Sequence, residues 1–171
     1  SEWWSLKKIW EKGLLYQGHK IVPYCPRCGT ALSSHEVAQG YKTVKEYSAF
    51  VRFPVKGCEK TYLLAWTTTP WTLPNNVALC VNAHEDYTYF TLNGDTMIMA
   101  DALIPAVFKP EDAESMEKLK TVKGEALRGI EYEPLYTCAS PREKAWYVVA
   151  DDYVTLTDGT GIVHIAPAFG E

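Results

Sequence analysis

The sequence lacks the long apolar run that a membrane-spanning helix requires, since no stretch approaches about eighteen consecutive apolar residues. Its first residues, Ser-Glu-Trp-Trp, lack the basic and then apolar layout of a secretory signal peptide. Positive charge is also scarce, because 17 Lys and Arg stand against 21 Asp and Glu. Clustered basic residues supply the affinity of proteins that wrap long nucleic acids, so this balance argues against such binding. We expect a cytoplasmic protein without membrane contact.

Cysteine is infrequent, and its odd number, five, does not suit a framework of disulfides. The sequence also contains no glycine-rich phosphate loop and no His-Glu-x-x-His metal motif. One close pair, Cys25-Pro26-Arg27-Cys28, is of the kind that supplies half of a tetrahedral zinc site. His35 and Cys58 are candidates for the other half. Cys25 and Cys28 are therefore possible ligands of a structural zinc ion in a larger protein.

The composition is that of a folded domain, with 47% hydrophobic residues in a chain of 171. Apolar residues at three- and four-residue steps predict a helix from Glu2 to about Tyr16, with one apolar face. We divide the chain into residues 1–45, a helix and Cys-x-x-Cys segment that connects to neighbouring domains, and residues 46–171, the core of the functional domain.

Short strands dominate the second part. The Asn93-Gly94-Asp95 sequence predicts a tight hairpin turn, because Asn-Gly readily adopts positive φ angles. The predicted strands cover residues 46–55, 62–65, 77–81, 87–92, 96–100, 145–155 and 162–165, and the predicted helices cover 102–108 and 112–120. This pattern predicts an α+β fold with a mainly antiparallel, barrel-like core and peripheral helices.

The segment after the strand at 62–65 is rich in threonine: Trp66-Thr67-Thr68-Thr69-Pro70-Trp71-Thr72-Leu73-Pro74-Asn75-Asn76. Its two prolines stiffen the backbone, and its hydroxyl and amide groups suit recognition of a polar group or a positioned water. The segment offers no strong nucleophile.

A histidine lies on the last predicted strand. On an extended chain His164 shares one face with Ile162 and Ala166, and we expect Val163 and Ile165 to face the core. Pro167 and Gly170 predict a rigid loop after this strand, which could meet the threonine segment across a pocket. Asp151 and Asp152 are adjacent on an extended chain and point to opposite sides, so they do not form an acid/base pair.

The segment WTTTPWTLPNN resembles the threonine-rich signature of the editing domain in isoleucyl-tRNA synthetases, and GTGIVHIAPAFGE resembles that family's second editing motif. The related valyl and leucyl enzymes usually carry arginine in place of Thr69 and another residue in place of His164. The resemblance implies an editing domain of that family's barrel-like fold. The two ATP-site signatures of class I synthetases, HIGH and KMSKS, are missing, so this chain should not activate an amino acid by itself.

The resemblance implies hydrolysis of valyl-tRNA(Ile) without a cofactor, with the tRNA 3′ end and the remainder of the synthetase as partners. Thr67, Thr68, Thr69 and Asn76 would hold the ribose, the ester and the attacking water. His164 would line the side-chain pocket, and the other expected substrate contacts are Trp66, Trp71, Thr72, Ala166 and Phe169. The family also carries an ammonium-binding aspartate a few residues after Phe169-Gly170, a position that Glu171 does not match, so we expect slow hydrolysis by this stretch alone.

Two other functions remain open from the residues. A thiol hydrolase could pair a cysteine with His164 and would be sensitive to alkylation. A zinc-knuckle module could bind tRNA without catalysis.

Overall fold

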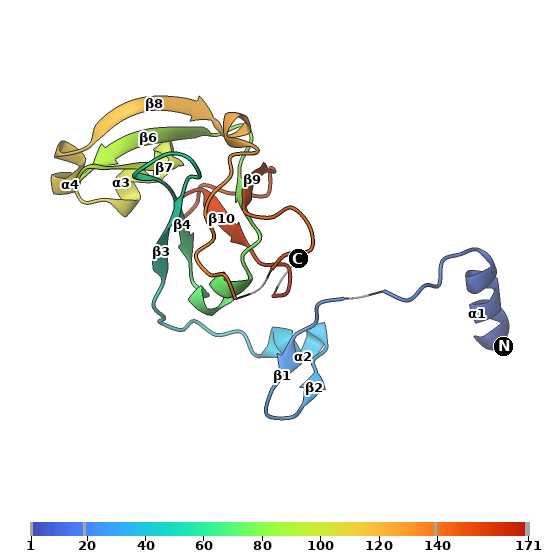
Figure 1. The fold of residues 1–171 in the computed structure, drawn as a ribbon. Helices are drawn as coiled ribbons and strands as arrows, with labels where there is room; N and C mark the ends of the chain where they lie inside the picture. The colour runs from blue at the N-terminus through green and yellow to red at the C-terminus, as the bar shows by residue number, and fades with distance from the viewer. Residues whose placement is uncertain (1, 19, 139, 170–171) are drawn as a thin grey trace. The chain divides into compact units, whose positions relative to one another are not determined.

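The computed structural model describes residues 2–18, 20–138 and 140–169, and the chain divides after Thr43 into two compact units (Figure 1). The division lies close to the predicted boundary at residues 45 and 46. The roles assigned to the two parts stay predictions.

The first unit consists of short elements. Its helices are α1 (Glu2–Glu11) and α2 (Ser34–Gln39), and β1 (Tyr24–Cys25) pairs antiparallel with β2 (Thr30–Ala31). Helix α1 ends earlier than predicted, and Gly13 adopts a φ of +68° just after it. No residue of α1 is buried, so its apolar face is exposed. Helix α2 begins with a capping box in which Ser33 and Glu36 satisfy each other's backbone N–H groups.

A five-stranded sheet forms most of the second unit. Its strand order is β3 (Ala49–Pro54), β4 (Thr61–Thr67), β7 (Asp95–Ala100), β6 (Asp86–Leu92) and β8 (Glu117–Lys123). Strands β4 and β7 are parallel, and the other neighbours are antiparallel. The predicted hairpin is confirmed, with Asn93 at φ +53° and Gly94 at φ +83° between β6 and β7.

The second sheet has three strands in the order β10 (Ile162–Ile165), β5 (Ala78–Val81) and β9 (Tyr147–Ala150). Strand β5 pairs antiparallel with β10 and parallel with β9. Strand β10 also packs against β4, which brings the two sheets together. The predicted barrel-like core is not confirmed, because neither sheet closes on itself in the part of the chain that the structure describes.

Short helices connect the strands: η1 (Pro70–Asn75), η2 (Asp101–Leu103), α3 (Ile104–Val107), α4 (Pro110–Glu114) and η3 (Gly124–Leu127). The predicted helix over 112–120 is wrong beyond Glu114, because strand β8 begins at Glu117. Pairing with β6 explains the difference: Thr121 lies 2.8 Å from the Thr88 hydroxyl, and the Lys120 ammonium lies 4.1 Å from the Tyr89 ring centre. Contacts between strands here override local helix preference.

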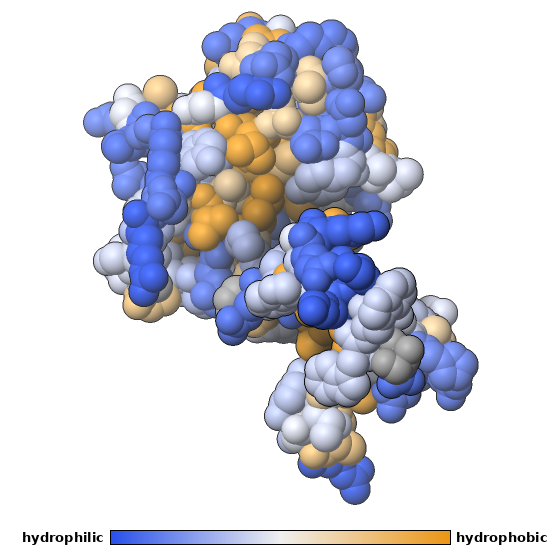
Figure 2. Space-filling view, turned by 90° about the vertical axis from the view of Figure 1, so that its right-hand side faces the viewer, coloured by the Kyte–Doolittle hydropathy of each residue, from blue (hydrophilic) through white to orange (hydrophobic). Residues whose placement is uncertain are grey.

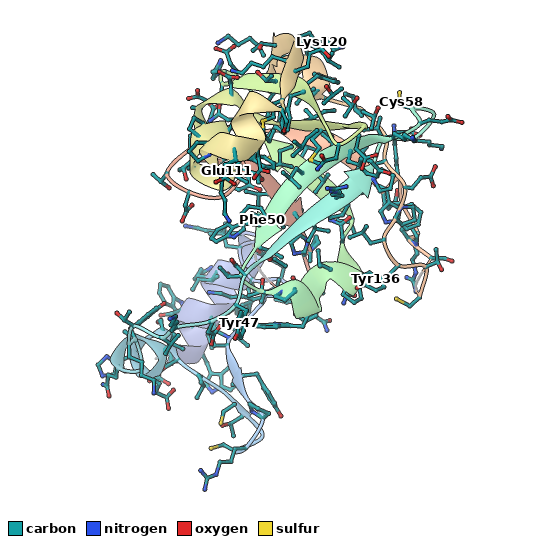
Figure 3. The ribbon with its side chains drawn as sticks, turned by 90° about the vertical axis from the view of Figure 1, so that its left-hand side faces the viewer. Tyr47, Phe50, Cys58, Glu111, Lys120 and Tyr136 are labelled. Carbon is teal, nitrogen blue, oxygen red and sulfur yellow. The ribbon has the colours of Figure 1, made fainter. Side chains whose placement is uncertain are left out.

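Apolar residues from both sheets form the core, and its largest fully buried side chains include Tyr87, Tyr132, Phe53 and Phe90. Strand β3 lies at the edge of the large sheet, where Phe50 is 51% exposed (Figure 3). On the face shown in Figure 2, apolar residues lie between bands of hydrophilic ones. Among the described residues, no helix has the length and apolar character needed to cross a membrane.

Candidate functional site

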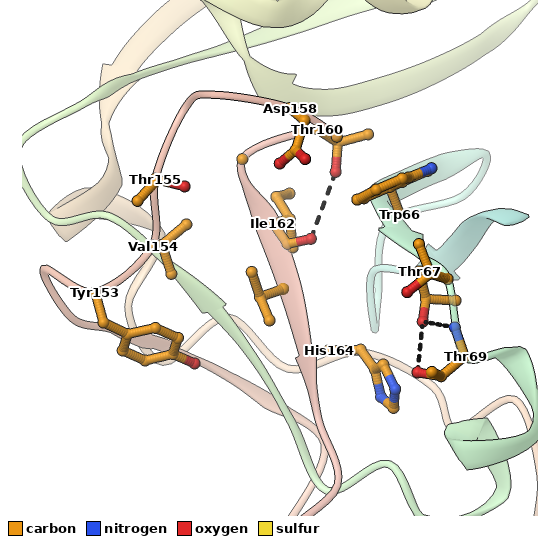
Figure 4. A pocket seen from close by; sticks show the side chains of 14 residues that line it. Trp66, Thr67, Thr69, Tyr153, Val154, Thr155, Asp158, Thr160, Ile162 and His164 are labelled. Carbon is orange, nitrogen blue, oxygen red and sulfur yellow. Dashed lines mark hydrogen bonds between the residues drawn. The ribbon is translucent and has the colours of Figure 1, made fainter. Parts of the chain in front are cut away.

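A cavity of about 300 Å³ lies in the second unit, beside the end of β4 (Figure 4). Its wall comes from the end of β4 and the residues after it, from the segment between β9 and β10, and from β10 itself. Five of the predicted site residues line it, namely Trp66, Thr67, Thr68, Thr69 and His164. The fold therefore brings the two sequence motifs together at one cavity.

The three threonines of the cavity wall differ in burial. Thr67 is the last residue of β4 and is 7% exposed, whereas Thr68 and Thr69 are exposed. The Thr67 Oγ1 accepts a hydrogen bond from the Thr69 backbone N–H at 3.1 Å and lies 3.3 Å from the Thr69 Oγ1. Pro70 then begins η1, which turns the chain away. The segment thus presents hydroxyl groups whose positions are held by a short turn.

His164 reaches the cavity from β10, where it pairs with Leu79 of β5. Its Nε2 lies 2.7 Å from the Thr72 Oγ1, and its Nδ1 lies 3.4 Å from the Asn76 Nδ2. Burial lowers the pKa of His164, because removal from water destabilises the charged imidazolium ion more than the neutral ring. The site therefore favours the neutral ring.

The prediction that Val163 faces the core is wrong. Val163 is 38% exposed, whereas Ile162 is 2% exposed and belongs to the core. The reason is that β10 packs against β4, so the face with Ile162 and His164 is the one that turns inward. His164 does share a face with Ile162, as predicted, but that face is the buried one.

Asn76 lies behind the cavity wall and is 9% exposed. Its Nδ2 donates to the Ala78 carbonyl at 2.9 Å, and its Oδ1 accepts from the Tyr132 hydroxyl at 2.6 Å. Its backbone carbonyl accepts from the Trp146 Nε1 at 3.2 Å. Asn76 does not line this cavity itself. It contacts His164, and His164 lines the cavity.

Two glycines of the second motif allow close packing at the cavity. Gly159 and Gly161 have φ angles of +74° and +72°, which disfavour other residues. A Cβ at Gly159 would lie 2.8 Å from the Trp66 ring, and a Cβ at Gly161 would lie 2.5 Å from the Ala100 Cβ. Both glycines therefore let the segment before β10 approach its neighbours, and Gly159 packs against the Trp66 ring.

The structure places the remaining predicted contacts outside the cavity wall. Thr72 is buried behind it, Trp71 is 64% exposed, and Phe169 is 54% exposed. Ala166 also does not line the cavity, and Glu171 lies outside the described residues. Contacts of these residues with a substrate stay predictions.

Several lining residues were not predicted from the sequence, among them Tyr153, Thr155, Asp158 and Thr160. For Asp158 the sequence predicts only an Asp-Gly turn before the last strand. The signal that could have found it is its position directly before the GTG of the second motif. Asp158 places one carboxylate among the hydroxyls of the wall.

The Cys25 and Cys28 pair lies in the first unit. The Cys28 backbone N–H donates to the Cys25 Sγ at 3.4 Å, and this bond is the largest cause that lowers the pKa of the Cys25 thiol. His35 contacts Gln39, and Cys58 belongs to the second unit. Within the described ranges no three His, Cys, Asp or Glu side chains gather around a metal position. The pair fits half of a zinc site, so zinc binding here stays a prediction.

Residues 1–159 match the family model described as tRNA synthetases class I (I, L, M and V). The protein named isoleucine-tRNA ligase of Clostridium acetobutylicum is 63% identical over 171 residues, which is 100% of this chain. The protein of the same name from Thermus thermophilus is 52% identical over 177 aligned positions, which cover 99% of this chain. The chain spans 16% of the length of each of these relatives.

Two solved structures share the fold. The structure described as GlLeuRS-CP1 has a TM-score of 0.56 at 16% identity and covers 71% of this chain and 53% of its own. The cytosolic leucyl-tRNA synthetase editing domain of P. knowlesi has a TM-score of 0.54 at 17% identity, over 74% of this chain and 60% of its own. At these identities the similarity establishes the architecture, with the cavity lying inside it.

Proposed function

We propose that this chain, which belongs to the class I tRNA synthetases of the isoleucine, leucine, methionine and valine group, is the editing module of an isoleucine-tRNA ligase. In this proposal the cavity receives the 3′ end of tRNA(Ile) that carries valine in error, and hydrolyses the ester. The support is similarity to proteins named isoleucine-tRNA ligase at identities from 50% to 63%, together with a fold shared with leucyl editing domains.

The need for such a module follows from the energetics of recognition. One methylene in an apolar pocket is worth about 1–3 kcal/mol, a magnitude already established for isoleucyl-tRNA synthetases as a class. Binding alone therefore cannot exclude valine from a site built for isoleucine. A second site that admits only the smaller product can remove the error.

The chemistry of the cavity suits attack by water. Thr67, Thr68 and Thr69 line the cavity with their hydroxyl groups. None of the residues that line it is a cysteine or a lysine. Threonine hydroxyls can orient a water molecule and donate hydrogen bonds to the oxygen that becomes negative as the ester is attacked. In the proposal they do both, and the released products are valine and the free 3′ hydroxyl of the tRNA.

The observation that carries the proposal is that the threonine segment and His164 line the same cavity. His164 lies on a strand whose backbone is held by pairing with β5, so its ring can form a wall that yields little. A wall of this kind admits valine and excludes the extra methylene of isoleucine, because overpacking costs about 1–3 kcal/mol.

A thiol mechanism has no comparable support. None of the five cysteines lines the cavity, and Cys80, on β5, is fully buried. Burial raises the pKa of the Cys80 thiol, which disfavours the reactive thiolate. We therefore expect ester hydrolysis to withstand thiol alkylation.

The proposal is tested by deacylation of valyl-tRNA and isoleucyl-tRNA. The two substrates are incubated with the 171-residue chain and with a full-length isoleucine-tRNA ligase that carries this chain at its editing position, and ester loss is followed. We expect the full-length enzyme to deacylate valyl-tRNA faster than isoleucyl-tRNA. The chain alone should be slower, because the resemblance assigns the ammonium contact to a residue beyond Glu171.

The assay separates the proposal from a binding module. Valyl-tRNA that is bound but not deacylated by the full-length enzyme would contradict the proposal and support binding without catalysis. Hydrolysis that stops after thiol alkylation would instead support the thiol mechanism.

A further inference from the structure

A series of hydrogen bonds runs behind the cavity wall and passes through the His164 ring. It joins Tyr132 to Asn76, Asn76 to His164, and His164 to Thr72, at 2.6, 3.4 and 2.7 Å respectively. Tyr132 is 2% exposed, and its ring packs edge-on against Phe53 at 5.2 Å between centres. No sequence motif points to Tyr132.

The Thr72 end of the series determines which atom of His164 carries the proton. The Thr72 hydroxyl has a single hydrogen, and it donates this hydrogen to the Thr69 carbonyl at 2.8 Å. The same oxygen must then accept from the ring nitrogen that lies 2.7 Å away. This arrangement favours a proton on Nε2 of His164.

The Asn76 end leads to the same tautomer independently. The Asn76 Nδ2 must be the amide nitrogen, because it lies 2.9 Å from the Ala78 carbonyl, which can only accept. Its second hydrogen points to the His164 Nδ1 at 3.4 Å, a long contact that requires a lone pair on Nδ1. A proton on Nδ1 would place two donors against each other.

Tyr132 keeps the Asn76 amide in this orientation. Its hydroxyl donates to the Asn76 Oδ1 at 2.6 Å, and a flipped amide would turn an oxygen toward the Ala78 carbonyl, which can only accept. Desolvation raises the pKa of Tyr132, which keeps the hydroxyl protonated and able to donate. Tyr132 is thus linked to the His164 ring through the Asn76 amide.

We propose that Tyr132 is a positioning residue that, through the Asn76 amide, holds His164 as the neutral tautomer protonated on Nε2, with both ring nitrogens turned away from the cavity. His164 lines the cavity, whereas Thr72 and Asn76 do not. The ring therefore presents its carbon atoms to the substrate and acts as an apolar wall. The consequence for specificity rests on the proposed function, whereas the tautomer itself does not.

The arrangement excludes His164 as the general base in this conformation. A base needs a free lone pair within hydrogen-bond reach of the water that it activates. The lone pair on Nδ1 faces the Asn76 amide, and Nε2 has none because it carries the proton. Water activation is left to the hydroxyls of the threonine segment.

The tautomer is tested without any substrate. In the 171-residue chain with ¹⁵N-labelled histidine, long-range ¹H–¹⁵N spectra report which nitrogen of each ring is protonated, and His164→Gln identifies the signals of this residue. We expect a neutral His164 with the proton on Nε2 at pH about 7. A proton on Nδ1, or an equal mixture of the two tautomers, would overturn the proposal whether or not the chain edits.

The role of Tyr132 is tested with Tyr132→Phe, which removes only the hydroxyl. We expect the Nδ1-protonated tautomer of His164 to become detectable beside the Nε2-protonated form that Thr72 still favours. In the full-length enzyme we expect a rise of roughly five- to tenfold in the ratio of isoleucyl-tRNA to valyl-tRNA hydrolysis, the size of one lost buried hydrogen bond. The matched control is Thr88→Val, which removes a buried hydroxyl that contacts Asp101 and Thr121 instead. The control should leave both the tautomer and the ratio unchanged.

A second variant keeps the test decisive if Tyr132→Phe does not fold. Thr72→Val removes the acceptor of the Nε2 proton and should also mix the tautomers. Unchanged tautomers in both variants would contradict the positioning role. Mixed tautomers with an unchanged substrate ratio would confirm the positioning of the ring and show that the tautomer has no consequence for specificity.

Discussion

Two layers of polar side chains at the cavity differ in what surrounds them. The front layer, Thr67, Thr68 and Thr69, lines the cavity, and two of its members are exposed. The back layer, Thr72, Asn76 and Tyr132, does not line it, and its members are 7%, 9% and 2% exposed. Both layers contain threonine hydroxyls, so residue type alone does not separate them.

The difference lies in hydrogen bonding. Each side chain of the back layer is bonded to groups within the protein, through contacts of 2.6 to 2.9 Å. Among the described residues, the hydroxyl groups of the front layer make the longer contacts of 3.1 and 3.3 Å, both between Thr67 and Thr69. Groups that are bonded within the protein hold geometry, whereas groups open to the cavity can bind a substrate. We therefore assign chemistry to the front layer and positioning to the back layer.

The largest effect is expected from the front layer. Replacing Thr67, Thr68 and Thr69 together by alanine should reduce valyl-tRNA hydrolysis by about 100-fold or more, as the loss of groups that stabilise a developing negative charge does. Because Thr67 is 7% exposed, the change should also lower the free energy of unfolding by about 1 kcal/mol. The measurements are deacylation rates in the full-length enzyme and urea unfolding of the chain.

The control for the triple variant is Thr88→Val together with Thr121→Val, which removes two hydroxyls that bond to each other at 2.8 Å. Hydrolysis should be unchanged in this control. Undiminished hydrolysis in a folded triple threonine variant would falsify the role of the front layer.

The next effect concerns the wall between the layers. His164→Ala should retain hydrolysis of valyl-tRNA and increase hydrolysis of isoleucyl-tRNA by about tenfold or more, because the space for one methylene is worth about 1–3 kcal/mol. The measurement is the ratio of the two deacylation rates in the full-length enzyme. Loss of valyl-tRNA hydrolysis without any gain on isoleucyl-tRNA would contradict the wall and support a base.

A smaller effect is expected on stability from the back layer. Asn76→Ala leaves the Tyr132 hydroxyl and the Ala78 carbonyl without their partner, so the free energy of unfolding should fall by about 1–3 kcal/mol. Its neighbour Asn75 is exposed, and Asn75→Ala is the matched control, expected to change stability by less than about 0.5 kcal/mol. Urea unfolding of both variants measures these changes in the free energy of unfolding. Equal stability would show that the back layer is not held by Asn76.

The smallest effect is a dependence on pH. Burial lowers the pKa of His164 below its ordinary value of 6.5, so between the two values the unfolded chain binds a proton that the folded chain does not. The resulting stability is present above pH 6.5 and is lost as the pH falls through the folded-state pKa. His164→Gln should therefore show a shallower decrease of melting temperature below pH 6.5 than the wild type. Identical slopes for the two proteins would contradict the shift.

Parts of the fold could be predicted because their signals are local. The Asn93-Gly94 turn and the strands ending at Val81 and Ile165 were predicted correctly from turn chemistry and apolar pattern. The strand at 117–123 was missed, because pairing with β6 decides its conformation and that partner is distant in sequence. The open form of the two sheets was missed for the same reason.

The candidate site was predictable to a similar extent. Thr67 and His164 belong to motifs that the sequence displays, and the fold brings both to one cavity. Tyr132 carries no motif, since its importance comes only from a contact with Asn76 that folding creates. The inward face of β10 was mistaken because the alternation of apolar residues does not reveal which side packs against β4.

The division of roles between the two layers is tested by one deacylation experiment on three full-length enzymes: the wild type, the triple threonine variant and Tyr132→Phe. Rates are measured on valyl-tRNA and on isoleucyl-tRNA under the same conditions. We expect the triple variant to lose activity on both substrates, and Tyr132→Phe to keep activity on valyl-tRNA while its preference for valyl-tRNA falls. If both variants lose activity in equal proportion on both substrates, the two layers have the same role and the division is contradicted.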